Sequence, residues 1–409
     1  MRISSLSVSD QLGGSEFALI AMLTAIRSIR PHWQVQVVLP GDGPLRTRAE
    51  QAGLACTSVP MPAALSHLGE WSTVQRGWTL GARVALGARL CAGGAALPAY
   101  EVKLRAALSR FEPDVIHTNG LKAHVLGARL RSSRTALVWH LHEYVSRRRV
   151  TRWLMRRYAS RCDALVANSA SVANDVRASL GPNPPTHVVP NAVDLQVFEP
   201  DGPRLDLDRL AGFQSVPAGV MRVGLIGTFA RWKGHEIFLD ALRHAPPTIR
   251  GYIIGGPLYD TANSQYTEQD LRQMIESRGL AGRVGLTGFA EAAPAIRALD
   301  VVVHASTEPE PFGLVIAEAM ACGRAVITTG SGGAAELIDP PHDALVVEPG
   351  DARALAGAVA RLAQDRILRD TLGRQARASA IARFALDRMA TSMASVFETV
   401  QPARLVHSA

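Results

Sequence analysis

The stretch VVVHASTEPEPFGLVIAEAMACGRAVITT, residues 301–329, decides the fold of this chain. It opens with an apolar run at Val301–Ala305 and closes with a second one at Ala325–Thr329. Short Val- and Ile-rich runs bounded by turn residues predict strands, and the longer apolar stretch after Gly313 predicts a helix. A strand, a helix and a second strand in this order indicate one parallel βαβ unit.

The same alternation continues in both directions from this stretch. Predicted strands in the first half are Arg2–Val8, Gln34–Pro40, Val115–Asn119, Ala136–His142, Ala164–Ser169 and His187–Pro190. In the second half they are Val223–Gly227, Tyr252–Gly255, Val284–Gly288 and Leu345–Val347, beside the two already named. Helical patterns lie between them, including a long Ala-, Leu- and Arg-rich stretch from about Trp71 to Arg110. The pattern predicts α/β architecture throughout.

The length of 409 residues predicts two α/β domains, because one core rarely serves so long a chain. A segment rich in Pro, Gly and Asp, residues 198–219, predicts the linker between them. The first domain is then expected at residues 1–197 and the second at residues 220–384. The tail from Asp351 onward predicts helices only.

The composition indicates a globular chain with a basic surface. Apolar residues make up 47% of the chain and charged residues 20%, and the formal net charge is +8. Such a surface attracts anionic partners, for example nucleotide diphosphates, acidic glycans or anionic lipid. Nucleic acid is not expected, because neither zinc-finger spacing nor an aromatic RNA-binding signature accompanies the charge.

The lack of recognisable targeting signals and the scattered cysteines predict a cytoplasmic chain. We find neither an uninterrupted apolar run of about 18 residues, as a spanning helix needs, nor the basic and apolar regions of a signal peptide at the start. The cysteines are scattered without a CxxC pair, which predicts a reducing compartment and neither a disulfide framework nor structural zinc. They are Cys56, Cys91, Cys162 and Cys322.

Unusual residues repeatedly follow the predicted strands. Asn119 and His142 each end a strand in the first half, and Lys233 closely follows one in the second. Gly256 and Glu310 do the same after two further strands. Ligands of open α/β sheets bind outside the carboxyl ends of the strands. We therefore expect these residues to line binding sites, which two facing sheets would pool in one cleft.

The strongest single signal is a pair of carboxylates, Glu310 and Glu318, on a predicted loop and helix. Eight residues apart, they lie on roughly one face. The backbone N–H groups of Phe312, Gly313 and Leu314 stand at the start of that helix, where an anion can bind. Two acids on a surface helix explain the pair equally well when it is taken alone.

In its wider setting this stretch resembles the E-x7-E signature of the retaining GT-B glycosyltransferases of glycosyltransferase family 4. Neighbouring segments resemble that family in the same order along nearly the whole chain. They are Gly14–Glu16, Val189–Asp194, Gly227–Gly234 and Ser331–Glu336. The resemblance implies a GT-B fold, with two Rossmann-like domains across a cleft. It also implies a C-terminal helix, residues 385–409, that packs back on the first domain.

The resemblance also implies roles for the donor-binding residues. Glu318 would accept hydrogen bonds from the nucleotide ribose, and Glu310 would contact the donor sugar. Amides of residues 312–314 would hold the sugar hydroxyls or phosphate, and Gly256 would belong to the same site. Lys233 would neutralise the diphosphate leaving group.

One position departs from the family. An arginine usually follows the glycine that ends the strand before Lys233, and Thr228 stands there instead. Arg231 is the available substitute, and we expect it to complete the phosphate clamp.

The first half carries the second predicted site. Family resemblance places an important His at the end of the strand Ala136–His142, and strand alternation puts His140 and His142 on one face. His142 precedes an acid, as in the family pattern, and is preferred without excluding His140. Gly14 would let the backbone approach the donor. Asn119 and Lys122 are expected to contact the acceptor.

The implied reaction is retaining transfer of a hexose from a nucleoside diphosphate sugar to a hydroxyl acceptor, with His142, Glu310 and Lys233 catalytic. No DxD-like motif suggests a metal, and no cofactor is expected beyond the sugar nucleotide. The acceptor would be a cell-surface glycan, a glycolipid or a small molecule. A nucleotide-sugar 2-epimerase and a catalytically silent glycan-binding subunit stay open as alternatives.

Two stretches suggest contact with a lipid surface at the inner face of the membrane. Residues 146–157 interleave arginines with apolar side chains, which is typical of a helix on an anionic surface but also of a solvated helix face. The stretch Trp71–Arg110 is a second candidate for lipid or acceptor contact, with an amphipathic helix packed on its own sheet as the alternative.

Overall fold

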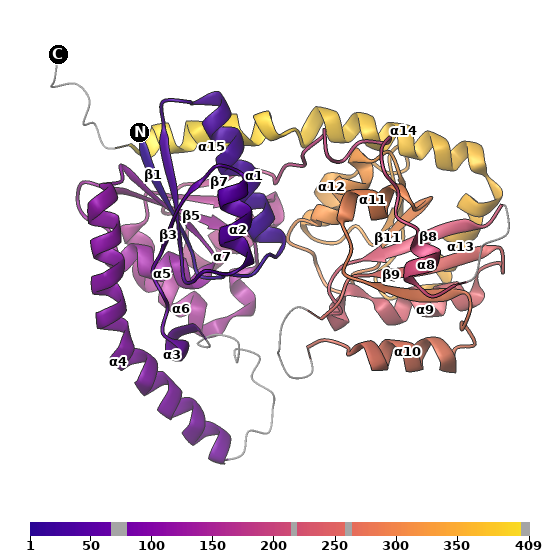
Figure 1. Cartoon of the computed structure of the whole chain (residues 1–409), viewed down its shortest axis with the longest axis horizontal. Helices are drawn as coiled ribbons and strands as arrows, with labels where there is room; N and C mark the ends of the chain where they lie inside the picture. The colour runs from indigo at the N-terminus through magenta and orange to yellow at the C-terminus, as the bar shows by residue number, and fades with distance from the viewer. Residues whose placement is uncertain (67–79, 214–218, 258–263, 402–409) are drawn as a thin grey trace. The chain divides into compact units, whose positions relative to one another are not determined.

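The structure is a computed structural model. It describes the backbone of residues 1–66, 80–213, 219–257 and 264–401, and the side chains of these residues except 80–92. The chain divides into two compact units (Figure 1). The first comprises Met1–Ala192 together with the segment from Leu386 onward, and the second comprises Val193–Ala385.

The first unit is built on a parallel sheet of seven described strands in the order β3-β2-β1-β4-β5-β6-β7. They are β1 (Arg2–Ser7), β2 (Gln34–Leu39), β3 (Ala55–Ser58), β4 (Val115–Asn119), β5 (Ala136–Leu141), β6 (Ala164–Ala167) and β7 (Thr186–Val188). The inner strands β1, β2, β4, β5 and β6 are almost entirely buried because helices cover both faces of the sheet. The strand order reverses between β1 and β4, which is the switch point where ligands of such sheets bind.

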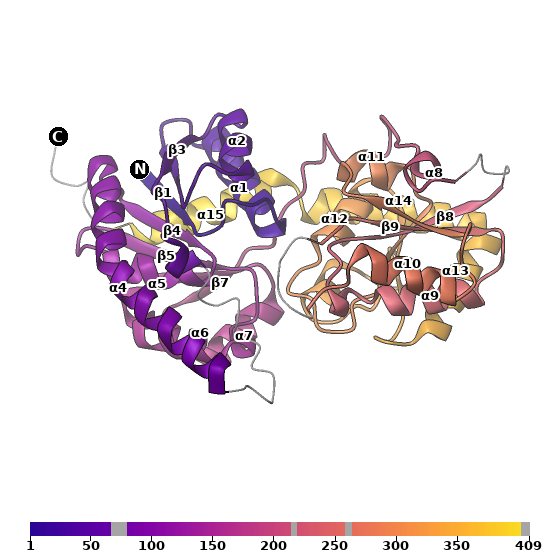
Figure 2. The same ribbon diagram turned by 60° about the horizontal axis from the view of Figure 1, so that its bottom comes forward.

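Helices cover the two faces of this sheet in separate groups (Figure 2). One group packs on one face: α1 (Gly14–Ile29), α2 (Pro44–Gln51) and the C-terminal α15 (Leu386–Val400). The other group covers the opposite face: α4 (Leu80–Phe111), α5 (Leu121–Leu130), α6 (Arg149–Tyr158) and α7 (Ala170–Leu180). The short α3 (Ala63–Ser66) contacts α4. Because α15 buries Met393 and Phe397 against α1, the C-terminal helix returns to the first unit, as predicted.

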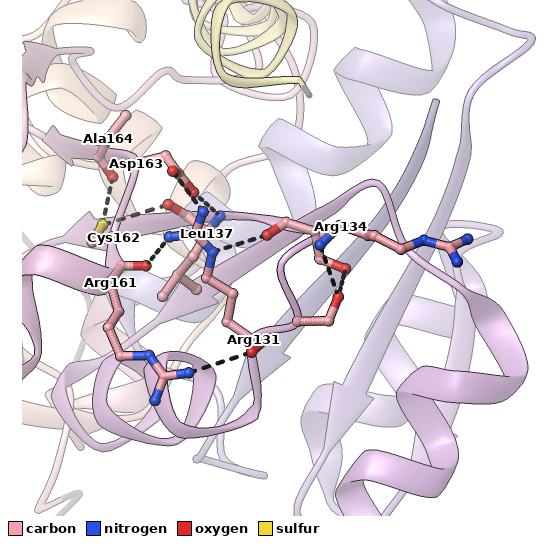
Figure 3. A network of polar contacts seen from close by, with 9 residues as sticks. Arg131, Arg134, Leu137, Arg161, Cys162, Asp163 and Ala164 are labelled. Atoms are coloured by element: carbon pink, nitrogen blue, oxygen red, sulfur yellow. Dashed lines mark hydrogen bonds and ion pairs between the residues drawn. The ribbon is translucent and has the colours of Figure 1, made fainter. Parts of the chain in front are cut away.

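The amino edge of this sheet is fixed by an arginine network (Figure 3). Arg131, after α5, donates to Asp163 at 2.8 Å and to the carbonyl of Thr135 at 3.0 Å. Asp163 in turn accepts the Leu137 N–H at 2.7 Å. The network ties the starts of β5 and β6 together.

The second unit repeats the design with six described parallel strands in the order β10-β9-β8-β11-β12-β13. They are β8 (Met221–Ile226), β9 (Ile249–Ile254), β10 (Val284–Gly288), β11 (Val301–His304), β12 (Ala325–Thr328) and β13 (Leu345–Val346). One face is covered by α9 (His235–His244), α10 (Glu268–Ser277) and α13 (Ala352–Gln364). The other carries α8 (Leu207–Leu210), α11 (Ala292–Arg297) and α12 (Leu314–Ala321). The next helix, α14 (Arg366–Arg383), packs against α12. The predicted two-sheet α/β fold is confirmed.

Two segments differ from the sequence expectation. Residues 198–219 were predicted to be a linker, but over their described part they pack on the second unit. Leu207 is buried there, and Asp208 accepts hydrogen bonds from Arg222 at 2.8 Å and Tyr252 at 2.6 Å. Strand β3 lacks a Val or Ile run, since it lies at the sheet edge, and was not predicted.

The predicted helix over Trp71–Arg110 corresponds to α4 from Leu80 onward. Trp71 and Trp78 lie outside the described residues. Over the described residues, no helix is both long and apolar enough to cross a membrane.

Candidate functional site

The switch point of the second sheet lies between β8 and β11, and the loops that follow these strands join at its carboxyl edge. After β8 the chain makes a single 3-10 turn, Arg231–Lys233. After β11 it runs through Ala305–Gly313 into α12. The N–H of Thr307 donates to the carbonyl of Trp232 at 2.8 Å, which fastens one loop to the other.

An ion pair spans the two loops. Lys233 Nζ donates to Glu310 Oε2 at 2.8 Å, and the two side chains are only 18% and 11% exposed. These residues are 77 positions apart in the sequence. Two predicted site residues, the phosphate-binding lysine and the first carboxylate of the E-x7-E signature, are therefore in direct contact.

Two further side chains converge on the same carboxylate oxygen. His304, the last residue of β11, places Nε2 3.2 Å from Glu310 Oε2, and Ser306 Oγ donates to that oxygen at 3.2 Å. The other ring nitrogen of His304, Nδ1, pairs with Thr328 Oγ1 at 3.1 Å. An ionised carboxylate only accepts hydrogen bonds, so Nε2 of His304 carries a proton in either charge state.

This environment keeps Glu310 ionised. Burial alone would raise its pKa, but the charge of Lys233 and the hydrogen bond from His304 outweigh burial and lower the pKa of Glu310 to about 2. The site thus holds a permanent carboxylate at a sheet edge, with a lysine beside it.

The backbone of Glu310 is fixed as well. Its N–H donates to the carbonyl of Ser331 at 3.1 Å, and its carbonyl accepts the N–H of Gly333 at 2.7 Å. Glu310 and Gly332 thereby form a parallel bridge. Gly332 has φ of +72°, a left-handed conformation that favours glycine. The Ser331–Gly333 segment is thus a support for Glu310.

Helix α12 starts beside this carboxylate. Its N-cap is Gly313, with φ of +93°, and the N–H of Ile316 returns to the carbonyl of Gly313 at 2.9 Å. Among the described residues nothing accepts from the N–H groups of Leu314 and Val315, so they can bind an anion. The ring of Phe312 is buried edge-on against Phe384 and anchors the loop.

Glu318 lies one turn further along α12. Glu318 is partly exposed, and its partial burial raises the pKa of its carboxyl group to about 8. Within the described part of the chain no side chain hydrogen-bonds to it. A protonated Glu318 can both donate and accept hydrogen bonds.

The other predicted donor-site residues line the loops around Lys233. The guanidinium of Arg231 lies 4.3 Å from the ring centre of Tyr266, and Lys233 Nζ lies 4.2 Å from that of Trp232. Gly234 has φ of +78°, and a Cβ there would lie 1.9 Å from the carbonyl oxygen of Ala305. Gly256 has no room either, because a Cβ would come within 2.6 Å of the Phe289 ring.

The remaining predicted residues belong to the first unit. His142 follows β5 with neither ring nitrogen hydrogen-bonded in the described structure, and burial lowers its pKa to about 4. Asn119 ends β4 and is 2% exposed, again with both side-chain polar atoms unpaired among described residues. Lys122 donates to the Ser66 carbonyl. Gly14 begins α1, and a Cβ there would meet open space.

Three further polar residues were not predicted from the sequence: His304, Ser306 and the buried His117 of β4. His304 ends a strand, and that position was the available signal, since the same rule selected Asn119 and His142. Its partner could not be inferred, because the contact with Glu310 depends on the path of the loop. Over the described residues, no three His, Cys, Asp or Glu side chains form a group that could hold a metal ion.

Curated relatives match a region of the chain. The D-inositol 3-phosphate glycosyltransferase of Xylanimonas cellulosilytica is 31% identical over 241 residues, which cover 58% of this chain and 56% of that protein. The GDP-mannose-dependent alpha-(1-6)-phosphatidylinositol monomannoside mannosyltransferase of Mycobacterium tuberculosis H37Rv is 29% identical over 265 residues, or 62% and 66% of the two chains. The match thus spans little more than half the length of the first relative.

A solved structure is similar over the whole chain. Anabaena Alr3699/HepE in complex with UDP-glucose is 27% identical, with 98% of this chain and 100% of that chain covered at a TM-score of 0.78.

Two family models match one unit each. Residues 13–197 match the model described as Glycosyltransferase Family 4, and residues 221–365 match the model described as Glycosyl transferases group 1. The chain therefore belongs to the group 1, family 4 glycosyltransferases and has their two-domain GT-B architecture.

Proposed function

We propose that this chain transfers a hexose from a nucleoside diphosphate sugar to a hydroxyl of a glycan or glycolipid acceptor, with retention at the anomeric carbon and without a metal ion. The observation that carries the proposal is the Lys233–Glu310 contact at the switch point of the second sheet. It places one fixed positive and one fixed negative group beside the N-terminus of α12. A sugar diphosphate needs both kinds of group, because its hydroxyls donate to carboxylates and its phosphates bind cations.

In this proposal Lys233 and the free amides of α12 take up the charge that develops on the departing diphosphate. Preorganised donors at such a position stabilise the transition state because they need no reorganisation. When phosphate reaches Lys233, the lysine exchanges part of its contact with Glu310 for the new anion. Glu310 can then accept hydrogen bonds from the sugar hydroxyls, while His304 and Ser306 keep the carboxylate in place.

Retention is proposed to proceed by front-face attack of the acceptor, with the leaving phosphate accepting its proton. The state of Glu310 supports this route over a covalent one. A carboxylate whose pKa is about 2, with three donors on one oxygen, is a weak base and correspondingly a weak nucleophile. Glu310 is thus suited to binding and charge stabilisation.

The first experiment is a thermal-shift screen with UDP, GDP, ADP, dTDP and their common hexose conjugates. UDP-glucose and GDP-mannose come first, because one relative structure holds UDP-glucose and one curated relative is GDP-mannose-dependent. A ligand that binds only the folded state raises the melting temperature. Glu310→Gln should remove sugar-dependent turnover, whereas the exposed control Glu348→Gln should not.

The anomeric configuration of the product, measured by NMR, decides retention, and turnover in the presence of EDTA decides metal independence. An inverted product or full loss with EDTA contradicts the corresponding part of the proposal. Conversion of the donor to an epimer without acceptor would indicate an epimerase instead. If no sugar nucleotide shifts the melting temperature, a catalytically silent binding subunit becomes the better interpretation.

We also propose that the first unit contacts anionic membrane surfaces through α6. Val150 and Trp153 on this helix are 69% and 65% exposed, amid several arginines. Beside it lies an open depression of about 460 Å³. It is lined by Glu101, Arg105, Arg129, Arg157, Tyr158 and Arg161. Apolar side chains amid cations suit a surface of anionic headgroups.

Sedimentation with phosphatidylglycerol vesicles, compared with phosphatidylcholine vesicles, tests this contact. Trp153→Ala should weaken binding to the anionic vesicles, whereas Ile367→Ala should not, although Ile367 is 80% exposed in the second unit. Equal binding to both lipids, or equal effects of both variants, would argue against the role of α6.

A further inference from the structure

A chain of buried hydrogen bonds crosses the first sheet beneath its carboxyl edge. Ser5 of β1 and His117 of β4 are register partners, and Ser5 Oγ lies 2.9 Å from His117 Nδ1. His117 Nε2 lies 3.2 Å from Nδ1 of His140 in β5. All three side chains are at most 2% exposed. The ring of Phe397 in α15 packs edge-on against His117 at 5.8 Å between centroids and closes this face.

The direction of this chain follows from its first member. In the described structure, the only acceptor near the Ser5 hydroxyl is His117 Nδ1, so the hydroxyl donates to it. Burial, and then the charge of His142, lower the pKa of His117 to about 3, so the ring is neutral. Its proton therefore sits on Nε2 and is donated to His140 Nδ1.

The same reasoning fixes the second histidine. Burial also lowers the pKa of His140 well below its usual range, so this ring carries one proton. Since Nδ1 accepts from His117, that proton is on Nε2. Nε2 is buried and has no partner among the described residues. The chain thus ends in an N–H donor with nothing to donate to.

Further unpaired groups lie on or just after the same strand and its two neighbours. Asn119 is the register partner of His140, and both its side-chain oxygen and nitrogen are buried without a partner in the described structure. The ring of His142 lies against that of His140, with centroids 4.1 Å apart. Asn168, after β6, is 2% exposed, and its Oδ1 also has no hydrogen-bond partner among the described residues. Buried polar groups are rarely left without partners, so a cluster of them at the carboxyl edge of a sheet is suited to a ligand that supplies the partners.

We propose that Ser5 and His117 are positioning residues that present the Nε2–H of His140 to a hydroxyl oxygen of the bound ligand, with Asn119 accepting the proton of that hydroxyl. This inference rests on the proposed function, which supplies a ligand rich in hydroxyls. A hydroxyl both accepts and donates, as this donor and acceptor require. None of these unpaired groups carries a charge, so the subsite suits an uncharged polyol rather than a phosphate or carboxylate.

NMR of the full chain with ¹⁵N-labelled histidine tests the protonation directly. Loss of one ring signal pair in His140→Gln assigns His140 among the 12 histidines of the chain. At pH 7 we expect the proton on Nε2 of His140, and we expect Ser5→Ala to give a mixture of both ring forms. Ser5→Thr keeps the hydroxyl and should restore the single form. A proton on Nδ1 in the unchanged protein, or no effect of Ser5→Ala, overturns the inference.

Kinetics with the sugar nucleotide that gives the largest thermal shift, starting with UDP-glucose, provide the second measurement. Ser5→Ala should lower kcat/KM about three- to tenfold, as expected for one weakened hydrogen bond, and Ser5→Thr should recover most of it. The control is His124→Gln, because His124 is equally buried and its Nε2 is also unpaired in the described structure, but its Nδ1 bonds Thr118 at 2.7 Å and its ring stacks on Trp139.

His124→Gln should lower the melting temperature and leave both the His140 signals and kcat/KM unchanged. Equal kinetic effects of Ser5→Ala and His124→Gln would reduce Ser5 to a packing role and overturn the inference. The NMR measurement needs no substrate. It therefore decides the positioning chain even if no sugar nucleotide is turned over, a result that would contradict only the proposed transfer.

Discussion

Replacing Lys233 with Met tests how much of the stability of the second unit depends on the Lys233–Glu310 pair. The folded structure lowers the pKa of Glu310 from 4.5 to about 2. At about 1.4 kcal/mol per pKa unit, this shift contributes roughly 3 kcal/mol to the free energy of unfolding at neutral pH. Removal of one partner of a buried pair typically costs about 3–5 kcal/mol, which agrees with this figure.

The pH dependence gives the sharper signature. Because the folded-state pKa of Glu310 is depressed, its contribution is fully present above pH 4.5 and is lost as the pH falls towards 2. In the unchanged protein about 2 kcal/mol of it should be lost between pH 7 and pH 3. In Lys233→Met the pKa of Glu310 rises, because the charge of Lys233 no longer opposes burial, and this loss should become smaller.

Urea unfolding at a series of pH values, followed by fluorescence and circular dichroism, measures both quantities. The matched control is Lys103→Met, since Lys103 is exposed on α4 of the first unit and the substitution is chemically the same. Lys233→Met should be less stable than the control by about 2–4 kcal/mol at pH 7, and this difference should shrink by up to about 2 kcal/mol at pH 3. If the two variants have the same stability at pH 7 and the same slope with pH, the pair does not stabilise the unit as argued.

Three further changes probe the same site. Because burial raises the pKa of Glu318 from 4.5 to about 8, the folded state holds a proton that the unfolded state releases, and stability should fall as the pH rises from 5 to 8. Glu318→Gln should flatten that fall by on the order of a few kcal/mol in unfolding measurements; an unchanged slope would contradict the burial of the carboxyl group. Gly234→Ala should lower the free energy of unfolding by at least about 2 kcal/mol, because a Cβ there meets the carbonyl of Ala305. The control Gly282→Ala, at φ of +77° but with open space around it, should lower it by only about 1 kcal/mol. Equal losses in the two variants would argue against the clash with Ala305. His304→Ala should lower sugar-nucleotide kcat/KM about tenfold and His304→Gln less, because Gln retains a donor towards Glu310; unchanged kinetics in both would remove His304 from the site.

The regular elements were predictable because their sequence signals are local. The runs Val115–Asn119 and Val284–Gly288 become strands with the predicted bounds, since a short run that begins with β-branched or apolar residues and is bounded by turn residues favours a strand. Strand β3 has no such run, because an edge strand is paired on one side only and Ala55–Ser58 is partly exposed. The 198–219 segment reads as a linker from its Pro, Gly and Asp content, but the buried contacts of Leu207 and Asp208 depend on the fold.

The candidate site was predictable by residue but not by contact. Sequence position, together with the family resemblance, placed Lys233 and Glu310 in one site, and the structure brings them to 2.8 Å. It could not show that they bind each other before any ligand arrives. Nor could it show that Glu310 and Glu318 have opposite pKa shifts, because these depend on the partners around each carboxyl group.

The two sheets use histidine in two different ways. His304 and His117 occupy corresponding strands, β11 and β4, each next to the first strand of its sheet. Both ring nitrogens of His304 have protein partners, so this side chain has no nitrogen left for a ligand and serves to hold Glu310 in place. His117 is likewise paired at both nitrogens, but one of its partners is another histidine, His140. Nε2 of His140 has no partner in the described structure. A fully paired histidine can only support its neighbours, whereas one with an unpaired nitrogen can bind a ligand. We therefore expect ligand-dependent changes in the NMR signals of His140, and much smaller ones in those of His117.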